Sequence, residues 1–82
     1  MTVRVDETGS IRLEGTCQID DAELLQRLLL AHPAAAVDWR DCEHAHTALI
    51  QLILAARRTV RGPSRVPFLE KWIAPHFHAL AP

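Results

Sequence analysis

The chain has 82 residues, a net charge of −1 and 49% hydrophobic residues. This length allows one small domain with a thin core, and this composition excludes an intrinsically disordered chain. No apolar run reaches the roughly 20 residues of a membrane span, and the first residues carry charges where a signal peptide needs an apolar core. We therefore expect a single domain over residues 1–82, without membrane insertion, in the cytoplasm and with both cysteines reduced.

Charge is distributed unevenly along the chain. Residues 1–43 contain four arginines and nine acids, a net of −5, whereas residues 44–82 contain five basic residues and one acid, a net of +4. Such asymmetry is found at binding surfaces, but it also arises when two oppositely charged halves neutralise each other in a compact fold. Nucleic-acid binding needs a stronger basic excess and exposed aromatic residues, so we expect no nucleic-acid partner.

The N-terminal part of the chain predicts a β-hairpin. Apolar and polar side chains alternate over residues 2–5 and again over residues 11–17, as they do in strands with one buried face. The sequence between them, Asp-Glu-Thr-Gly-Ser, is typical of a turn with Gly9 at its flexible position. Gly15 interrupts the second strand and indicates a bulge there.

Residues 18–33 predict the first helix. Asp20 is a favourable N-cap, and Glu23 stands at the spacing of a capping box. Leucines at positions 24, 25, 28 and 29 form an apolar stripe, and Pro33 ends the helix.

The middle of the chain predicts a buried strand, a loop and a second helix. Residues 34–39 are short and apolar, residues 40–46 are mostly polar, and residues 47–58 are apolar at almost every position before two arginines. Thr47 is placed to cap this helix, and Arg57 and Arg58 complement the negative end of its dipole. A helix that is apolar nearly all round needs a sheet on one side and neighbouring helices or a partner on the other.

The last third of the chain predicts a short strand over residues 59–61 and a third helix over residues 66–74, with Pro67 in its first turn. The order of elements predicts an α/β fold with a small mixed β-sheet of about four strands and about three helices packed mainly on one face. The apolar stripe of the third helix contains Phe68, Leu69, Trp72 and Ile73.

Cysteine and histidine side chains at alternate positions raise the question of a metal site. Cys42, His44 and His46 would share one side of an extended segment, and His76 and His78 repeat the spacing. Structural zinc sites usually pair their ligands at CxxC or HxxxH spacing, however, and neither spacing occurs. We therefore expect no metal and no other cofactor, with a His/Cys metal-binding protein as an alternative hypothesis.

Two kinds of catalytic site are disfavoured by the sequence. Asp41, Cys42 and His44 have the residue types of a nucleophilic triad, but within one short stretch they do not readily reach hydrogen-bonding geometry. The three glycines are isolated, which excludes a phosphate-binding loop. We expect that the chain is not an enzyme.

Thr47 stands at the predicted start of the second helix. A hydroxyl at this position ordinarily serves as a cap. A phosphoryl group there would add about −1.5 to −2 charges where the helix dipole tolerates them. Phosphorylation of Thr47 would therefore change the surface without unfolding the domain, which makes this residue a candidate regulatory site.

The segment AAVDWRDCEHAHTALIQLILAAR, residues 35–57, resembles the central part of the STAS family, the sulfate-transporter and anti-sigma-factor-antagonist domain. Asp38 falls on the acid that ends a strand in this family, and His44-Ala45 falls on the apolar pair before the helix-opening motif. Residues 46–49 fall on the motif itself, which places Thr47 on its phosphorylatable hydroxyl.

The flanking sequence agrees with the same resemblance. Residues 11–29 are similar to the second strand and first helix of the family, and residues 60–73 are similar to its closing strand and last helix. Two positions depart from the family pattern, because His46 replaces an acid and Leu49 replaces a glycine.

The resemblance implies a bacterial-type, non-enzymatic signalling protein that binds a protein partner. The implied partner is an anti-sigma factor that is also a serine/threonine kinase, or a sensor complex, and the implied modification is phosphorylation of Thr47. The implied contact surface is the second helix with the segment before it. The residues predicted to bind the partner are Asp41, Cys42, Glu43, His44, His46, Thr47, Ala48, Gln51 and Arg58.

Two further alternatives are compatible with the sequence. STAS domains also serve as accessory subunits of chemosensory or lipid-transport assemblies, where binding does not require phosphorylation. The apolar second helix also suits homodimerisation, which is compatible with each of these functions.

Overall fold

The structure is a computed structural model that describes residues 2–73, with the side chains of residues 70 and 72 excepted. It contains strands, two α-helices and a short π-helical turn. In chain order they are β1 (Val3–Val5), β2 (Ile11–Cys17), α1 (Asp21–Ala31), β3 (Val37–Ala45), α2 (Thr47–Ala56), β4 (Val60–Arg61) and η1 (Leu69–Ile73).

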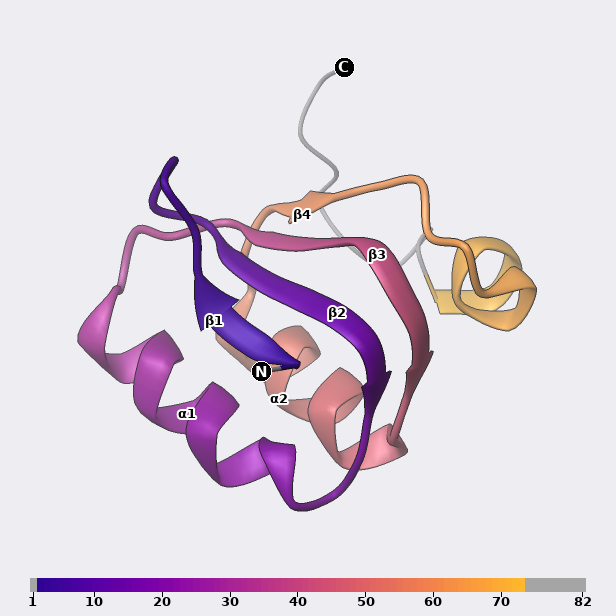
Figure 1. Ribbon diagram of the computed structural model, residues 1–82, viewed down its shortest axis with the longest axis horizontal. Helices are drawn as coiled ribbons and strands as arrows, with labels where there is room; N and C mark the ends of the chain where they lie inside the picture. The colour runs from indigo at the N-terminus through magenta and orange to yellow at the C-terminus, as the bar shows by residue number, and fades with distance from the viewer. Residues whose placement is uncertain (1, 74–82) are drawn as a thin grey trace.

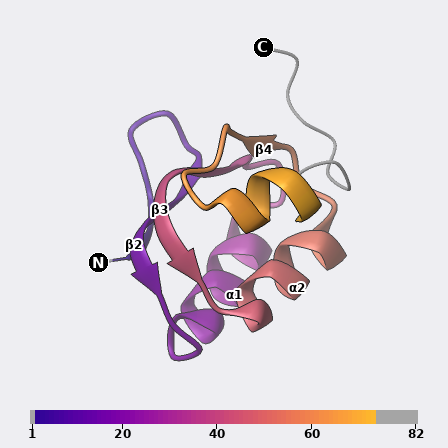
Figure 2. The same cartoon turned by 90° about the vertical axis from the view of Figure 1, so that its right-hand side faces the viewer.

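The four strands form one mixed sheet in the order β1-β2-β3-β4. Strand β1 runs antiparallel to β2, whereas β2, β3 and β4 run parallel to one another. Both α-helices lie side by side on the same face of this sheet, and η1 lies on the side of the sheet where β3 and β4 are (Figure 1, Figure 2). The predicted small α/β fold with a four-stranded mixed sheet is therefore confirmed, and the likeness to STAS topology stays a prediction.

The third helix, predicted over residues 66–74, differs in type from the prediction. Residues 67–73 are helical, and five of them, Leu69–Ile73, form the π-helix η1. Leu69 is buried as expected, but Phe68 is 60% exposed. A π-helix closes hydrogen bonds over five residues, so the 3.6-residue spacing behind the predicted stripe does not apply. The prediction for the Trp72 side chain falls outside the described residues.

The β1–β2 hairpin forms where the sequence predicts it. Gly9 in its turn has a φ of +84°, a left-handed conformation that glycine adopts without steric cost. The Asp6 carboxylate accepts hydrogen bonds from the Thr8 hydroxyl and from the backbone N–H groups of Thr8 and Ser10. These hydrogen bonds hold the pKa of Asp6 below its ordinary value, and the bond from the Thr8 hydroxyl contributes most.

The core lies between the sheet and the two α-helices. The predicted leucine stripe of α1 is confirmed, since Leu25 and Leu29 are buried and Leu24 and Leu28 are half-buried against the same cluster. Full burial of one such side chain stabilises the fold by roughly 1.5–3 kcal/mol. The cluster of buried residues consists of Val3, Ile11, Leu13, Cys17, Leu25, Leu29, Val37, Trp39, Cys42, Leu49, Ile50, Ile53, Val60 and Leu69.

The start of α1 differs from the predicted capping box. Asp20 is the N-cap residue, but its side chain makes no capping hydrogen bond. Its backbone is already helical, with φ −62° and ψ −24°, whereas a capping side chain needs an extended backbone to reach the first N–H groups. Instead, the Asp21 carboxylate accepts a hydrogen bond of 2.8 Å from the N–H of Gln18.

Strand β3 is longer than the sequence predicts. The sequence predicts a strand over residues 34–39 and a loop over residues 40–46, whereas β3 begins at Val37 and ends at Ala45. The polar segment stays extended because it continues to pair in parallel with β2. The register shifts twice, and at each shift β3 has one residue more than β2, as in a β-bulge. The second shift follows Gly15, where the sequence predicts an irregularity.

Candidate functional site

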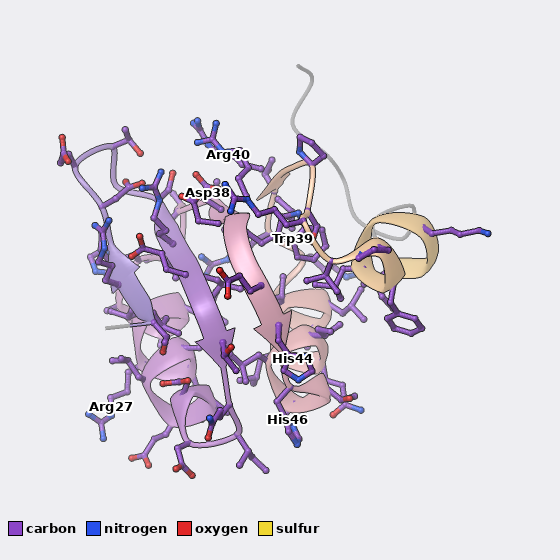
Figure 3. The ribbon with its side chains drawn as sticks, turned by 45° about the vertical axis from the view of Figure 1, so that its right-hand side comes forward. Arg27, Asp38, Trp39, Arg40, His44 and His46 are labelled. Atoms are coloured by element: carbon purple, nitrogen blue, oxygen red, sulfur yellow. The ribbon has the colours of Figure 1, made fainter. Side chains whose placement is uncertain are left out.

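The predicted site residues meet where β3 ends and α2 begins. Figure 3 shows His44 and His46 at this end of β3, away from Asp38 and Arg40 at its start. Ala45 is the last residue of the strand and Thr47 the first of the helix, so that His46 alone connects the two elements. The N–H of His46 donates a hydrogen bond of 2.9 Å to the carbonyl oxygen of Cys17, which fixes this corner to the end of β2.

His46 caps α2. Its ring Nδ1 accepts a hydrogen bond of 3.0 Å from the N–H of Ala48, and its backbone is extended, with φ −61° and ψ 145°. The first N–H groups of a helix have no partner within the helix, so this ring nitrogen satisfies one of them. The predicted cap at Thr47 is therefore wrong by one residue. His46 stands where the STAS pattern has an acid, and an acid is itself a favourable N-cap.

Thr47 presents its hydroxyl to solvent. The residue is exposed, and within residues 2–73 its side chain makes no hydrogen bond. Gln51, four residues later, lies on the same side of α2 and is also exposed. Leu54 adds an apolar side chain that is 38% exposed. The outward side of α2 thus begins with a hydroxyl and continues with uncharged side chains.

Most of the predicted partner-binding residues lie at this corner and are accessible. Glu43, His44, His46, Thr47 and Gln51 are exposed, and Ala48 is half-buried. We call these six residues the α2-start surface.

Cys42 and Arg58, two other residues predicted to bind the partner, lie outside this surface. Cys42 is 0% exposed and belongs to the core. The Arg58 guanidinium donates hydrogen bonds to the carbonyl oxygens of Leu29 at 2.5 Å, His32 at 2.8 Å and Ala35 at 3.1 Å. Arg58 therefore caps the C-terminal end of α1, rather than the end of its own helix.

The reversal of the chain after α2 explains the position of Arg58. Helix α2 ends at Ala56, two residues before the predicted end, and Arg57 adopts a left-handed backbone with φ +54°. A left-handed residue after a helix turns the chain sharply away from the helix axis.

Asp41, another residue predicted to bind the partner, is half-buried. Its carboxylate lies 3.8 Å from the guanidinium of Arg12 and 3.9 Å from that of Arg65.

The two cysteines form a buried pair of thiols. Cys17 and Cys42 are both 0% exposed and reduced. The Cys17 thiol donates to the carbonyl oxygens of Thr2 at 3.6 Å and Glu14 at 3.7 Å, and the neighbouring Cys42 thiol together with burial raises the pKa of Cys17. Cys42 is the cysteine of the candidate triad, and because its side chain is buried a substrate has no access to its thiol.

The geometry gives no support to the metal and triad hypotheses. Cys42 points into the core, whereas His44 and His46 are exposed, because the second bulge lies between Cys42 and His44. The Cys42 thiol lies 3.3 Å from the backbone carbonyl oxygen of His44. No group of three His, Cys, Asp or Glu residues suitable for a metal ion occurs among the described residues. The predictions for His76 and His78 fall outside this range.

A groove between α1 and α2 was not predicted from the sequence. It has a volume of about 530 Å³ and adjoins the α2-start surface, with which it shares Ala48 and Gln51. Alanines at positions 22 and 48, one on each helix, leave the space between the helices unfilled. Small residues on facing helices are its only signal in the sequence. The lining residues are Ile19, Ala22, Glu23, Gln26, Ala48, Gln51 and Leu52.

The start of β3 is held by ion pairs on the face of the sheet that the helices do not cover. Asp38 is 1% exposed. Its carboxylate lies 2.7 Å from the guanidinium of Arg40 and 3.6 Å from the guanidinium of Arg12. Burial opposes its ionisation, but the hydrogen bonds from Arg40 and the charges of Arg40 and Arg12 outweigh burial and lower the pKa of Asp38. Asp38 thus stabilises the strand rather than contributing to the α2-start surface.

None of the helices within residues 2–73 has the length and hydrophobicity needed to cross a bilayer. In comparisons with known proteins, no family model, no curated protein and no solved structure matches the chain. The STAS resemblance therefore depends on the sequence motifs alone.

Proposed function

We propose that this chain is a non-enzymatic signalling domain that binds a protein partner through the α2-start surface. The observation that carries the proposal is the composition of α2. Its ten residues, Thr47–Ala56, include no charged side chain, although Thr47, Gln51, Leu54 and Ala55 are exposed. Helix faces that contact only water usually carry charged residues, whereas the centres of protein interfaces are depleted in charge.

Thr47 is the proposed point of regulation. Its exposed hydroxyl is one turn from Gln51 and adjoins the groove through Ala48. A phosphoryl group at this position would lie beside the N–H groups at the start of α2, which favour negative charge. Phosphorylation would therefore alter the contact surface and leave the core intact. The STAS resemblance supports the same residue and suggests a partner that is a serine/threonine kinase.

Site-specific photo-crosslinking tests the proposed surface. A photoreactive phenylalanine analogue replaces Gln51 or His44 in the full chain, inside cells of the organism that encodes it, and mass spectrometry identifies the crosslinked proteins. We expect the same protein to be captured from both positions and not from Glu7, an exposed residue in the β1–β2 turn. Crosslinks from all three positions, or from none, would contradict the proposal.

The regulatory part is tested with the purified partner. If the partner is a kinase, incubation with ATP should place a phosphate on Thr47, which peptide mass spectrometry detects. Thr47→Glu should change the affinity for the partner relative to Thr47→Ala. Docking without regulation, as in an accessory subunit, would be indicated by an unmodified Thr47 together with equal affinities of the two variants.

A further inference from the structure

The groove between α1 and α2 has the form of a site for one helix of a partner. It lies between two neighbouring helices, and its apolar lining includes Ala22, Ala48 and Leu52. Ile19 at its end is 57% exposed. A hollow between two helices accepts the ridge of a third helix, whose large apolar side chains occupy the space above small residues.

The charges around the groove are mostly acidic. Glu23 is the only charged residue that lines it, and Asp20 and Asp21 follow Ile19 at the start of α1. Helix α2 contributes no charge. Arg27 is the one basic residue of α1, and it pairs with Glu23 at 2.7 Å in an exposed ion pair. Because the charges of Glu23 and Arg27 balance each other, the net negative charge at this end of the groove comes from Asp20 and Asp21.

We propose that this groove binds a basic amphipathic helix of the partner, an inference that rests on the proposed function and specifies its ligand. The apolar face of that helix packs on Ala22, Ala48 and Leu52, and flanking lysines or arginines face Glu23 and the acids beside Ile19. The proposal also predicts whether a negative charge at Thr47 raises or lowers the affinity for this helix. A negative charge at Thr47 strengthens binding of a basic helix, because Thr47 is on the same side of α2 as Gln51, which lines the groove.

Two designed peptides test the charge preference with the 82-residue chain. Each is a fluorescein-labelled helix of roughly 18 residues with one leucine face; one carries lysines beside that face and the other carries glutamates. Fluorescence anisotropy measures both affinities at about 50 mM and about 300 mM NaCl, since salt screens exposed charges. We expect the lysine peptide to bind at least about tenfold more tightly at low salt, with a smaller ratio at high salt.

Matched variants of the chain locate the binding. Ala48→Leu fills the groove and should weaken binding of the lysine peptide about tenfold, whereas Ala55→Leu adds the same atoms at an exposed position outside the groove and should leave it unchanged. Glu23→Gln should weaken binding about threefold, whereas Glu7→Gln should not, and Thr47→Glu should strengthen it about threefold. Thermal melting of each variant verifies that it is folded.

Several outcomes would overturn the inference. They are equal binding of the two peptides, no binding of either, equal effects of Ala48→Leu and Ala55→Leu, and a dimer in sedimentation analysis that Ala48→Leu, but not Ala55→Leu, converts to a monomer. If Gln51 and His44 still crosslink to one protein in cells, the proposed function stands and only the basic helix fails. If these crosslinks are absent, the proposed function itself fails.

Discussion

The two ends of β3 differ in how they are held. At its start, Val37 and Asp38 pair with β2 on one side and with β4 on the other. The Asp38 carboxylate is buried and bound by arginine. At its end, the strand pairs with β2 alone, contains a bulge, and presents Glu43 and His44 to solvent.

Residues that stabilise the fold and residues proposed to bind the partner therefore lie at opposite ends of the same strand. Side chains at the start of β3 are engaged with each other, so their replacement is expected to affect the fold. Side chains at its end make few contacts within the domain, apart from the capping bond of His46. Polar residues that the fold does not use are available for a partner, which agrees with the proposed α2-start surface. Substitutions at the start of β3 should therefore change the stability of the domain, and substitutions at its end should change the binding of the partner.

Asp38→Asn should destabilise the domain by about 2 kcal/mol, because it weakens charge-assisted hydrogen bonds of a buried carboxylate. The matched control is Asp20→Asn, an exposed acid whose side chain makes no capping bond, with an expected change within about 0.5 kcal/mol. Urea unfolding followed by circular dichroism measures both. Equal losses for the two variants would contradict the assignment of Asp38 as the anchor of this end.

The stability of the wild-type chain should fall in acid. The pKa of Asp38 is lower in the folded state than its ordinary value of 3.8, so the ionised carboxylate stabilises the fold above that pH. This contribution is lost as the pH decreases below 3.8 toward the lowered value. The pKa of Glu14 is also lowered, first by its hydrogen bond with Arg4, and it adds to the same trend. Urea midpoints between about pH 6 and pH 3 should therefore decline less in Asp38→Asn than in the wild type.

At the other end of β3, His46→Ala should cost about 1 kcal/mol, since the N–H of Ala48 loses its acceptor. His46→Asp restores an acceptor and adds a favourable charge at the helix N-terminus, so it should recover the wild-type stability or exceed it. His44→Ala is the control, because His44 is exposed. If His46→Asp is as unstable as His46→Ala in thermal unfolding, the capping role of His46 is wrong.

Local patterns predicted the parts of the fold that depend on local structure. Alternation and Gly9 predicted the hairpin, and the leucine stripe predicted the buried side of α1. The start of α2 at Thr47 was also predicted, but its cap was placed one residue too late. The capping residue was missed because a histidine is not a usual cap, although its neutral ring has an acceptor nitrogen.

The incorrect predictions concern features that depend on distant residues. Residues 40–46 look like a loop because most of them are polar, but pairing with β2 keeps residues 40–45 in the sheet. Arg58 caps α1 from a distant part of the sequence. Two of its three hydrogen bonds are to residues that precede it by 26 positions or more. The groove arises because Ala22 and Ala48 belong to neighbouring helices, and the sequence alone does not place them together.

Thr47→Glu should have the smallest effect on stability, with a change of at most about 0.5 kcal/mol and in the stabilising direction, since a negative charge at the first position of a helix interacts favourably with its dipole. Gln51→Glu introduces the same charge one turn later, where the dipole contributes less, and should show no gain. Thermal unfolding at low salt resolves the two variants if they are measured together. Because Thr47 has no hydrogen bond to lose within the described residues, any large destabilisation by Thr47→Glu would contradict its placement on the surface. A neutral effect on the fold, combined with a changed affinity for the partner, is the behaviour that a phosphorylation site on this corner requires.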